Sequence, residues 1–490
     1  MTTKAQLMAE NQRLKRRVAD LEAQNKALKK RVEELEAERT SLNAALKETR
    51  ANLLAQKRAG KRQAAPFSKG KKDNPRRPGR KKGHPAAHRP LPEEVDREVD
   101  VPLKQQSCLL CGGELTERRT VSQYQIDIPP VSPIVTRFNI ETARCACCGK
   151  RAQGRDPQQI SDAYGAAQVH FGPRLLSLAA TIKHIYGLPY RKVCLLLNNG
   201  FGVKVSPAAL ARASQRLGKK AKPTYERLIF ELRNEKVVGG DETGWPLMGD
   251  NAWLWVFTSS RIAVYAIDPR RAGEVAERIL GRDFQGTLVT DCFIAYDPLP
   301  YQQQKCLGHF LRRCKDNISV LPALTPAVAL SYRLLWLLRG AISLRKEKDT
   351  LSPEVFTQDR QLIEDAFDLL LQTVIGEDED DEARRLAKLL RKQRQRLFVF
   401  LYNDAVPYTN NASERALRPA AVTRKVSAGN RSEAGAEAHA IILSLHRTCH
   451  LLDIDFQELM TEILRQASPE AISLLEYAGV SDEETPPLPP

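Results

Sequence analysis

The chain has 490 residues, too many for a single hydrophobic core, so its length predicts several domains. Lys and Arg number 76 against 59 Asp and Glu, and this net charge of +17 points to a polyanionic partner, with nucleic acid the expected one. The sequence has no run of eighteen apolar residues and no apolar segment behind a basic N-terminus, which excludes a predicted membrane span or signal peptide. We therefore expect an intracellular protein, in which close pairs among the ten cysteines favour metal binding over disulfides.

Residues 1–55 predict a parallel, two-stranded coiled coil. Leucine occupies every d position of a heptad repeat, at Leu7, Leu14, Leu21, Leu28, Leu35 and Leu42. The a positions include Val18, Asn25 and Val32, and β-branched or asparagine residues at a with leucine at d favour a dimer. The alternative is a surface helix packed on its own domain. We expect a homodimer.

Residues 56–95 predict a basic, flexible linker. Lys, Arg, Pro and Gly dominate its sequence, so it cannot form a core. Its basic centre can lie in a DNA groove or along phosphates, or it can be a solvated linker only. The candidate DNA contacts here are Arg76, Arg77, Arg80 and Lys81.

Residues 96–160 predict a zinc-binding module. Two Cys-x-x-Cys-Gly turns are separated by alternating segments, 122–128 and 134–144, that predict β-strands. Two such turns supply the four thiolates of a tetrahedral zinc site, with ligands Cys108, Cys111, Cys145 and Cys148. Cys147 is an alternative to Cys148 as the fourth ligand, and a redox pair is the alternative to zinc.

Residues 165–234 predict a helical domain. One helix stops at an Asn-Asn-Gly sequence and a second begins at Ser206-Pro207, an arrangement similar to a helix-turn-helix. Its second helix would present Arg212, Gln215 and Arg216 to DNA. The alternative is a helical pair without a DNA-binding role.

Residues 235–320 predict the first part of a catalytic core. Strands are expected at 237–241, 253–258, 262–267 and 287–291, with a helix at 272–280 before the fourth strand. Three strands, a helix and a strand open the ribonuclease-H-like fold, in which the first and fourth strands are parallel neighbours. Asp241 and Asp291 end these two strands, so the pattern predicts that their carboxylates meet at a metal site.

A two-metal site needs a further carboxylate, and Glu414 is the candidate. It begins a helical stretch in the second part of the core, 403–478, where the alternative is a capping box with Asn411 as N-cap. Basic residues that can face phosphates or only water follow at Arg415, Arg418, Arg424 and Lys425. Between the two parts, a strand and a helix should bring His309 near the acids. Residues 321–402 then predict an α-helical insertion, and 479–490 a disordered tail.

The order of these motifs resembles that of transposases of the insertion-sequence sixty-six family. The Asp-Glu-Thr-Gly-Trp, Cys-Leu-Gly-His-Phe-Leu-Arg-Arg and Asn-Asn-Ala-Ser-Glu-Arg-Ala-Leu-Arg-Pro blocks carry the resemblance over nearly the whole chain. It implies a DDE triad of Asp241, Asp291 and Glu414 that holds two Mg²⁺ or Mn²⁺ ions. The family usually has Gly-Tyr after the second Asp, whereas this chain has Cys292-Phe293.

The predicted fold is thus multidomain: a coiled coil, a zinc-ribbon-like module, a helix-turn-helix-like domain and an α/β ribonuclease-H-like core with an α-helical insertion. The predicted function is a cytoplasmic, nucleoid-associated transposase that cleaves and joins double-stranded DNA at the terminal repeats of its element and at a target. The resemblance also implies accessory proteins encoded by the same element. The alternatives are an inactive zinc-containing DNA-binding regulator and a nuclease that only hydrolyses.

Overall fold

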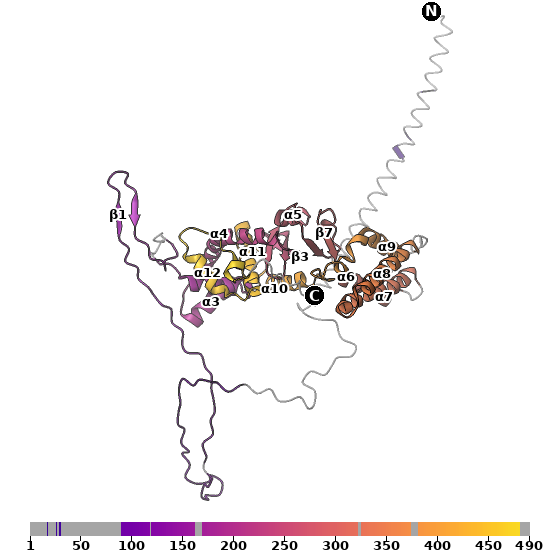
Figure 1. The fold of residues 1–490 in the computed structure, drawn as a ribbon. Coiled ribbons are helices and arrows are strands. Elements are labelled where there is room, and N and C mark those ends of the chain that lie inside the picture. The colour runs from indigo at the N-terminus through magenta and orange to yellow at the C-terminus, as the bar shows by residue number, and fades with distance from the viewer. Residues whose placement is uncertain are drawn as a thin grey trace, which may run out of the picture. The chain divides into compact units, whose positions relative to one another are not determined.

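The computed structural model describes residues 90–117, 119–161, 169–321, 325–373 and 381–480, together with the helical residues Arg17, Lys26, Lys29 and Lys30. The chain divides into two units, residues 1–124 and 125–490, and each is considered by itself (Figure 1). Apart from those four residues, the predicted coiled coil lies outside the described part. So do the linker contacts Arg76, Arg77, Arg80 and Lys81 and residues 481–490 of the tail.

A five-stranded mixed sheet forms the centre of the second unit, in the order β5-β4-β3-β6-β7. Strands β3 (Val237–Leu247), β4 (Asp250–Thr258) and β5 (Ala263–Asp268) form antiparallel hairpins. Helix α5 (Glu274–Leu280) crosses over to β6 (Thr287–Thr290), which lies parallel to β3 and to β7 (Gln302–Lys305). The predicted element order, and the prediction that the first and fourth strands are neighbours, are confirmed.

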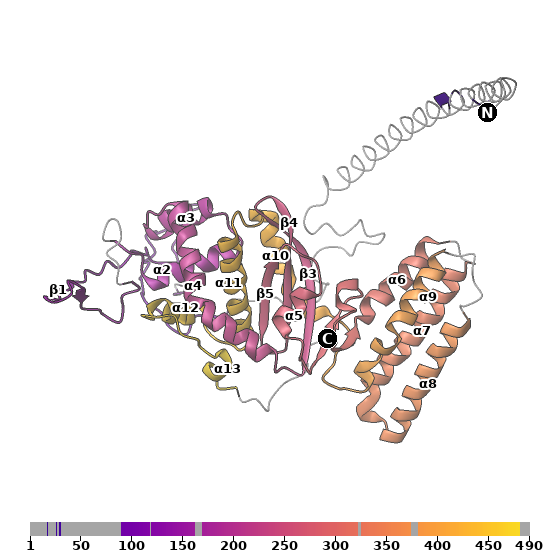
Figure 2. The same cartoon turned by 90° about the horizontal axis from the view of Figure 1, so that it is seen from above.

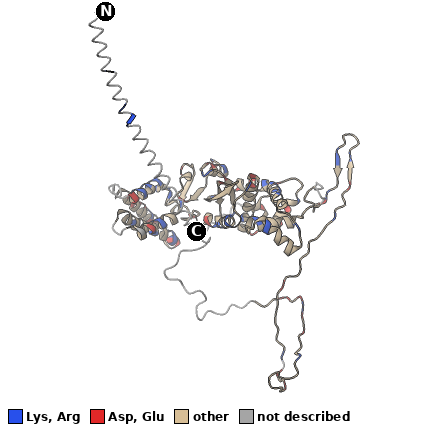
Figure 3. Ribbon diagram, turned by 180° about the vertical axis from the view of Figure 1, so that it is seen from behind, with Lys and Arg blue, Asp and Glu red and all other residues tan. Residues whose placement is uncertain are grey.

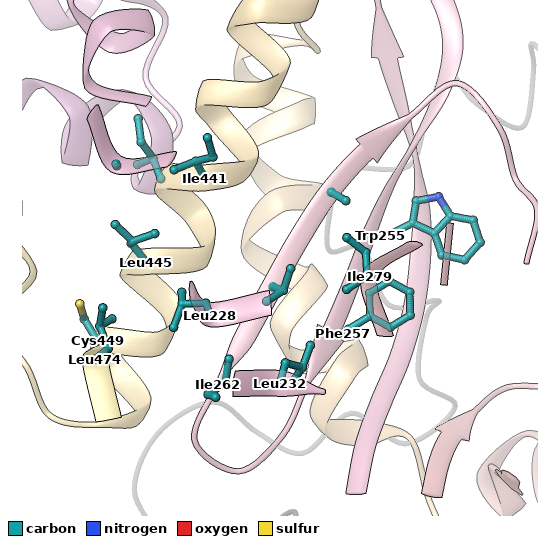
Figure 4. Close-up of a cluster of buried hydrophobic side chains, with 14 of the residues drawn as sticks. Leu228, Leu232, Trp255, Phe257, Ile262, Ile279, Ile441, Leu445, Cys449 and Leu474 are labelled. Atoms are coloured by element: carbon teal, nitrogen blue, oxygen red, sulfur yellow. The ribbon is translucent and has the colours of Figure 1, made fainter. Parts of the chain in front are cut away.

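Adjacent residues of β3 enter different cores because a strand alternates its faces. Val238 packs in the larger core, with Trp255 and Phe257 of β4 and with helices α5 and α4 (Pro207–Leu232), as Figure 4 shows for several of these side chains. This core also receives α11 (Glu433–Leu451), α12 (Phe456–Arg465) and α13 (Leu474–Tyr477). Val237 packs instead with the helical insertion. Both faces of the sheet are therefore covered.

The insertion consists of α7 (Pro326–Glu347), α8 (Pro353–Thr373) and α9 (Asp381–Gln393), as predicted from the sequence. With α6 (Leu307–Val320) these helices share one apolar core, and Figures 1 and 2 show them on the opposite side of the sheet from α2 (Pro173–Ala180), α3 (Tyr190–Phe201) and α4. Residues 326–350 have the length and hydropathy of a membrane span, but 56% of the apolar window is buried in the fold. This helix therefore has the packing of a core helix.

Helices α3 and α4 form the predicted helical pair. Gly202 ends α3 in a left-handed conformation, and the Ser206 hydroxyl accepts the Ala209 N–H at 3.2 Å to cap α4. The start of α4 packs with α2 and α3 through Leu210, whereas its last turns place Leu228 and Leu232 in the sheet core. One continuous helix therefore joins the helical region to the sheet.

The segment between the two cysteine turns differs from the prediction. Residues 122–128 form no strand, and of 134–144 only β1 (Thr142–Arg144) is a strand, paired with β2 (Arg151–Gln153). Ile126 and Ile134 are 83% and 94% exposed. Alternation of apolar residues predicts a strand only where one face has a layer to pack on, and these side chains have none among the described residues.

A buried histidine pair joins α11 to the one-turn π-helix η1 (Thr181–Ile185). The Nδ1 atoms of His184 and His439 lie 2.8 Å apart, and His439 stacks on Trp245 with ring centroids 5.0 Å apart. One imidazole must donate and the other accept, which requires the accepting ring to be neutral. Burial, with a smaller contribution from Lys183, lowers the pKa of His439 to about 3, and burial also lowers the pKa of His184.

These depressed pKa values predict that the fold loses stability in mild acid. Below about pH 6.5 the unfolded chain protonates both histidines and the folded chain does not, so the free energy of unfolding falls by up to about 1.4 kcal/mol per pH unit for each. The melting temperature should therefore fall more steeply from pH 7 to pH 5 for the native chain than for His439→Gln. Replacing the exposed His170 by Gln should leave the slope unchanged, and equal slopes for all three chains would contradict the prediction.

Candidate active site

Asp241 and Asp291 are brought together by the parallel pairing of β3 and β6. Val237 pairs with Thr287 and Gly239 with Val289, and two more steps along both strands place the two aspartates side by side on the same face. The prediction that Asp241 ends its strand is wrong. β3 continues to Leu247 because β4 pairs with it along that length, whereas Asp291 directly follows the last residue of β6.

Glu414 lies in the first turns of α10 (Asn411–Ser427), which packs across β3, near enough for its charge to act on Asp241. The approach is close: a Cβ on Gly239 would lie 2.4 Å from the Ser413 Oγ. Asn410 fastens the start of the helix by donating its side-chain amide to the Gly240 carbonyl at 2.8 Å. Gly239, two residues before Asp241, therefore leaves the space in which the start of α10 lies.

The capping-box alternative for Glu414 is wrong. The N-cap position is held by Asn410 and makes no side-chain cap hydrogen bond, so Glu414 lies one residue beyond the position that a capping box requires. The Asn410 side chain is committed to β3 instead of to the helix. The carboxylate of Glu414 is thus not used to cap α10.

The electrostatics of Asp241 reflect this gathering of acids. Burial, then the neighbouring Glu242 carboxylate, and with smaller effects Asp291 and Glu414, raise the pKa of Asp241 to about 7, although the Glu242 N–H donates to its Oδ1 at 2.9 Å. Three predicted site residues therefore lie close enough for their charges to repel. A concentration of negative charge of this kind is what a divalent cation would relieve.

Glu242 points to the other face and has its own partners. Its carboxylate accepts the Tyr296 hydroxyl at 2.6 Å and both Nε and a terminal nitrogen of Arg271, at 3.0 and 2.8 Å. Burial raises the pKa of Glu242, and these two donors act against the rise. The Arg271 guanidinium also stacks on Trp253 and Phe293, at 4.3 and 3.8 Å from the ring centroids. The alternation of the strand thus separates the two adjacent acids, and Glu242 braces the segment that follows Asp291.

His309 lies beside Glu414, as predicted. Its Nε2 is 3.8 Å from the Glu414 Oε1, and its Nδ1 is buried without a hydrogen-bond partner among the described residues. With the Cys306 Sγ these atoms lie within 4.8 Å of one another. Cys314 is absent from this group, because it is buried in the core of the insertion.

Two further residues lie at the site: Cys306, which the sequence offered together with His309 and Cys314 as a possible second metal site, and Lys305, which was missed in the sequence. The buried Cys306 Sγ accepts the Asn410 N–H at 3.2 Å and so links the starts of α6 and α10. Lys305, fully buried at the end of β7, donates to the Thr290 hydroxyl at 3.1 Å and lies 3.6 Å from Asp297; burial lowers its pKa. The sequence of β7, Gln-Gln-Gln-Lys, contains no apolar residue and therefore did not predict that this strand is buried.

The predicted DNA-binding residues have different surroundings. Arg212 and Arg216 are exposed on α4 and Gln215 is half-buried; Arg415, Arg418 and Lys425 are exposed on α10. Arg424 instead donates to the Gly244 carbonyl, and to the Thr243 hydroxyl at 3.2 Å, so its guanidinium helps to hold α10 on β3.

The raised pKa of Asp241 predicts that this carboxylate reduces stability at high pH. Between about pH 4 and 7 the folded chain keeps a proton that the unfolded chain loses, so stability falls as the pH rises through this range. At pH 8 and without divalent cations, Asp241→Asn should raise the free energy of unfolding by at least about 1 kcal/mol, with little change at pH 4. Urea unfolding measures both values. Asp250→Asn, an exposed change on the β3–β4 hairpin, should have no such effect at either pH.

A mixed five-stranded sheet with helices on both faces and carboxylates beside its parallel strands fits a nuclease-like core. The model of the transposase IS66 family matches residues 168–438, more than half of the chain, and the chain belongs to that family. Two uncharacterized proteins of Sinorhizobium fredii are similar to it. Protein y4qI is 25% identical over 426 residues, which cover 80% of this chain and 75% of the relative; protein y4hP is 23% identical over 429 residues, with coverages of 79% and 75%.

Proposed function

We propose that this protein is a DNA transposase that cleaves the ends of its element and joins them to target DNA by a DDE mechanism. Membership of the transposase IS66 family supports the class. The observation that carries the mechanism is the gathering of acids around Asp241: burial, then Glu242, and with smaller effects Asp291 and Glu414, raise the pKa of Asp241.

The donor set fits two divalent cations. Three carboxylates offer the hard oxygen ligands that Mg²⁺ or Mn²⁺ prefers, and their mutual repulsion would be relieved by bound positive charge. When bound, such ions supply activation of a water or a DNA 3′-hydroxyl and stabilise the leaving oxygen of an in-line displacement at phosphorus. Asp241, Asp291 and Glu414 would hold the ions, Asn410 and Cys306 fix the start of α10, and His309 lies beside Glu414.

The DNA-binding surfaces belong to the same proposal. Arg415, Arg418 and Lys425 lie on the helix that carries Glu414 and form the proposed basic surface for the substrate backbone, while Arg424 holds this helix on β3. Arg212, Gln215 and Arg216 would contact the terminal repeats, with Arg76, Arg77, Arg80 and Lys81 along the flanking phosphates. A coiled-coil homodimer would pair two element ends in the cytoplasm, at the nucleoid, with accessory proteins of the element as further partners.

We also propose that Cys108, Cys111, Cys145 and Cys148 bind zinc. Each turn has the same hydrogen bonds: Gly112 N–H donates to the Cys108 carbonyl and Gly149 N–H to the Cys145 carbonyl, both at 2.9 Å. Backbone N–H groups lower the pKa of the Cys108 and Cys145 thiols, which favours the thiolate that zinc requires.

The matching turns predict that Cys147 is not a ligand. In its turn Cys147 occupies the place that Leu110 holds in the other, so Cys148 corresponds to Cys111. The purified chain should contain one zinc ion, measured by mass spectrometry of the metal. Cys148→Ser should abolish stoichiometric zinc and the matched control Cys147→Ser should retain it; the reverse pattern would make Cys147 the fourth ligand.

The direct test of the proposed function is an assay with DNA that carries the inverted repeats flanking the coding region. With Mg²⁺ or Mn²⁺ the protein should cleave at the repeat ends and join the resulting 3′-ends to a target plasmid. Cleavage without joining would indicate a nuclease that only hydrolyses. Binding without either reaction would indicate a regulator.

A further inference from the structure

One side of α7 is an exposed surface that combines aromatic and basic residues. Intervals of three and four residues place them on one side of the helix. We call this surface the α7 face: Tyr332, Arg333, Trp336, Arg339, Gly340 and Lys346. Trp336 is 78% exposed and Tyr332 57% exposed. The opposite side of α7, which includes Leu334 and Leu338, already fills the core of the insertion. The two aromatic rings are therefore not required by the packing of this fold.

The basic residues of the α7 face are available to a partner. Arg333, Arg339 and Lys346 form no ion pair within the described part of the chain, although the insertion carries acidic and basic residues together (Figure 3). Other cations of this layer are paired: Arg313 with Glu382 at 2.8 Å, and Arg394 with Asp368. The α7 face thus has net positive charge around an exposed indole: three basic residues stand against one exposed acid, Glu347, at the C-terminal end of the helix, which accepts the Ser343 hydroxyl at 2.6 Å.

Gly340 lies on the same face, next to Trp336 in space. A glycine inside a helix lowers its stability relative to alanine. A Cβ at this position would meet nothing within 4 Å, so no contact within the fold accounts for the glycine. A partner that approaches the helix backbone closely would account for it.

We propose that the α7 face binds a DNA strand, with an unpaired base stacked on Trp336 and the flanking phosphates on Arg333, Arg339 and Lys346. This rests on the proposed function, in which DNA is the substrate. An exposed indole stacks on any base whose face is free, and neighbouring cations hold the backbone. Paired bases inside a duplex offer no free face, so a strand end with unpaired nucleotides is the ligand that fits.

The position of α7 relates this surface to the candidate active site. Arg345, near the C-terminal end of α7, donates to the Asp404 carbonyl at 3.0 Å, and the segment after Asp404 leads directly into α10, the helix of Glu414. From Lys346 the α7 face extends about 21 Å to Tyr332, at 1.5 Å per residue. A DNA strand bound along the α7 face would therefore begin near the segment that precedes Glu414 and extend away from it.

The test is a titration of the full chain with a duplex that has a single-stranded 3′ overhang and with the blunt duplex. Trp336 is the most exposed of the four tryptophans, so stacking should quench the protein's fluorescence with the overhang and much less with the blunt duplex. Trp336→Phe should remove the quench. Trp336→Ala should raise the Kd for the overhang about tenfold. The matched controls on α8 and α9, Leu362→Ala and Lys388→Gln, remove an exposed apolar and an exposed basic residue and should change neither readout.

Gly340→Ala gives a second readout that does not depend on loss of a side chain. The added methyl enters open space and a better helix former replaces glycine, so the melting temperature should stay the same or rise. The same methyl should weaken overhang binding several-fold. If this variant and Trp336→Ala both bind the overhang with native affinity, the proposal is wrong. It is also wrong if both variants change only the oligomeric state in light scattering, because the face would then contact a second copy of the chain.

The failure of this proposal is distinguishable from failure of the proposed function. Asp241→Asn should abolish cleavage and leave the fluorescence quench intact. Cleavage by the native chain without any quench would overturn the α7 face alone. Fluorescence quenching by the overhang without DNA cleavage, with any divalent metal, would support DNA binding at the α7 face and contradict the catalytic proposal.

Discussion

Replacing Asp241 by Asn is expected to reduce DNA cleavage and strand transfer by at least roughly a thousandfold. A metal-bound carboxylate supports several kcal/mol of transition-state stabilisation, and each 1.36 kcal/mol is a factor of ten in rate. Asp291→Asn and Glu414→Gln should have effects of the same size, because all three acids contribute to one charge cluster. The measurement is single-turnover cleavage and joining of end-containing DNA, with binding followed separately.

Two control variants separate a catalytic loss from a structural one. Asp250→Asn changes an exposed acid on the same sheet and should leave the rate unchanged. Glu242→Gln weakens the contacts to Arg271 and Tyr296, so it should lower the melting temperature and reduce the rate far less than Asp241→Asn. If Glu242→Gln instead abolishes cleavage while Asp241→Asn is active, the assignment of the two neighbouring acids must be exchanged.

The second large effect is expected from Gly239→Ala. Its Cβ would lie 2.4 Å from the Ser413 Oγ and 3.1 Å from the Asn410 Oδ1, so α10 must shift away from β3. Overpacking of this kind costs about 1–3 kcal/mol of stability. The displacement of Glu414 should also lower the cleavage rate about a hundredfold, because catalytic groups tolerate little displacement. Urea unfolding and single-turnover cleavage measure the two effects.

A double variant tests whether the contact with Ser413 is the cause. The Ser413 Oγ is buried without a hydrogen-bond partner in the described structure, so Ser413→Ala alone should be nearly neutral. Combined with Gly239→Ala it should recover part of both losses, a coupling that additive effects would not give. Gly244→Ala is the matched control in the same strand, since its Cβ would meet only Arg424 at an ordinary 3.6 Å.

The parts of the site that the sequence predicted are those with a local signal. Val237–Val238 and Thr287–Leu288–Val289 are short β-branched and aliphatic runs before an aspartate, so the two strands and their aspartates could be placed. His309 was expected near the acids because β7 and α6 follow β6 directly. The class of protein came from motif order, not from the physical chemistry of single residues.

The remaining features depend on contacts between distant segments. Nothing near Asn410 in the sequence indicates that its amide binds the Gly240 carbonyl, and a capping box with Asn411 as N-cap was the local explanation for Glu414. Lys305 is buried because β7 lies at the sheet edge beneath the insertion, which its polar sequence does not suggest. Conversely, the alternation around Ile126 predicted a strand where the fold supplies no layer to cover it.

The core segments before and after the insertion meet where the Leu307 N–H, at the start of α6, donates to the Tyr408 carbonyl at 2.9 Å. The core thus holds the two ends of the inserted segment together. When the ends of a segment are fixed, its closure entropy changes only slowly with its length. The helical layer can therefore vary in size and surface while the three acids keep their geometry. If the proposed roles are correct, the sheet keeps the catalytic acids in place while the DNA-binding surface of the insertion can change independently.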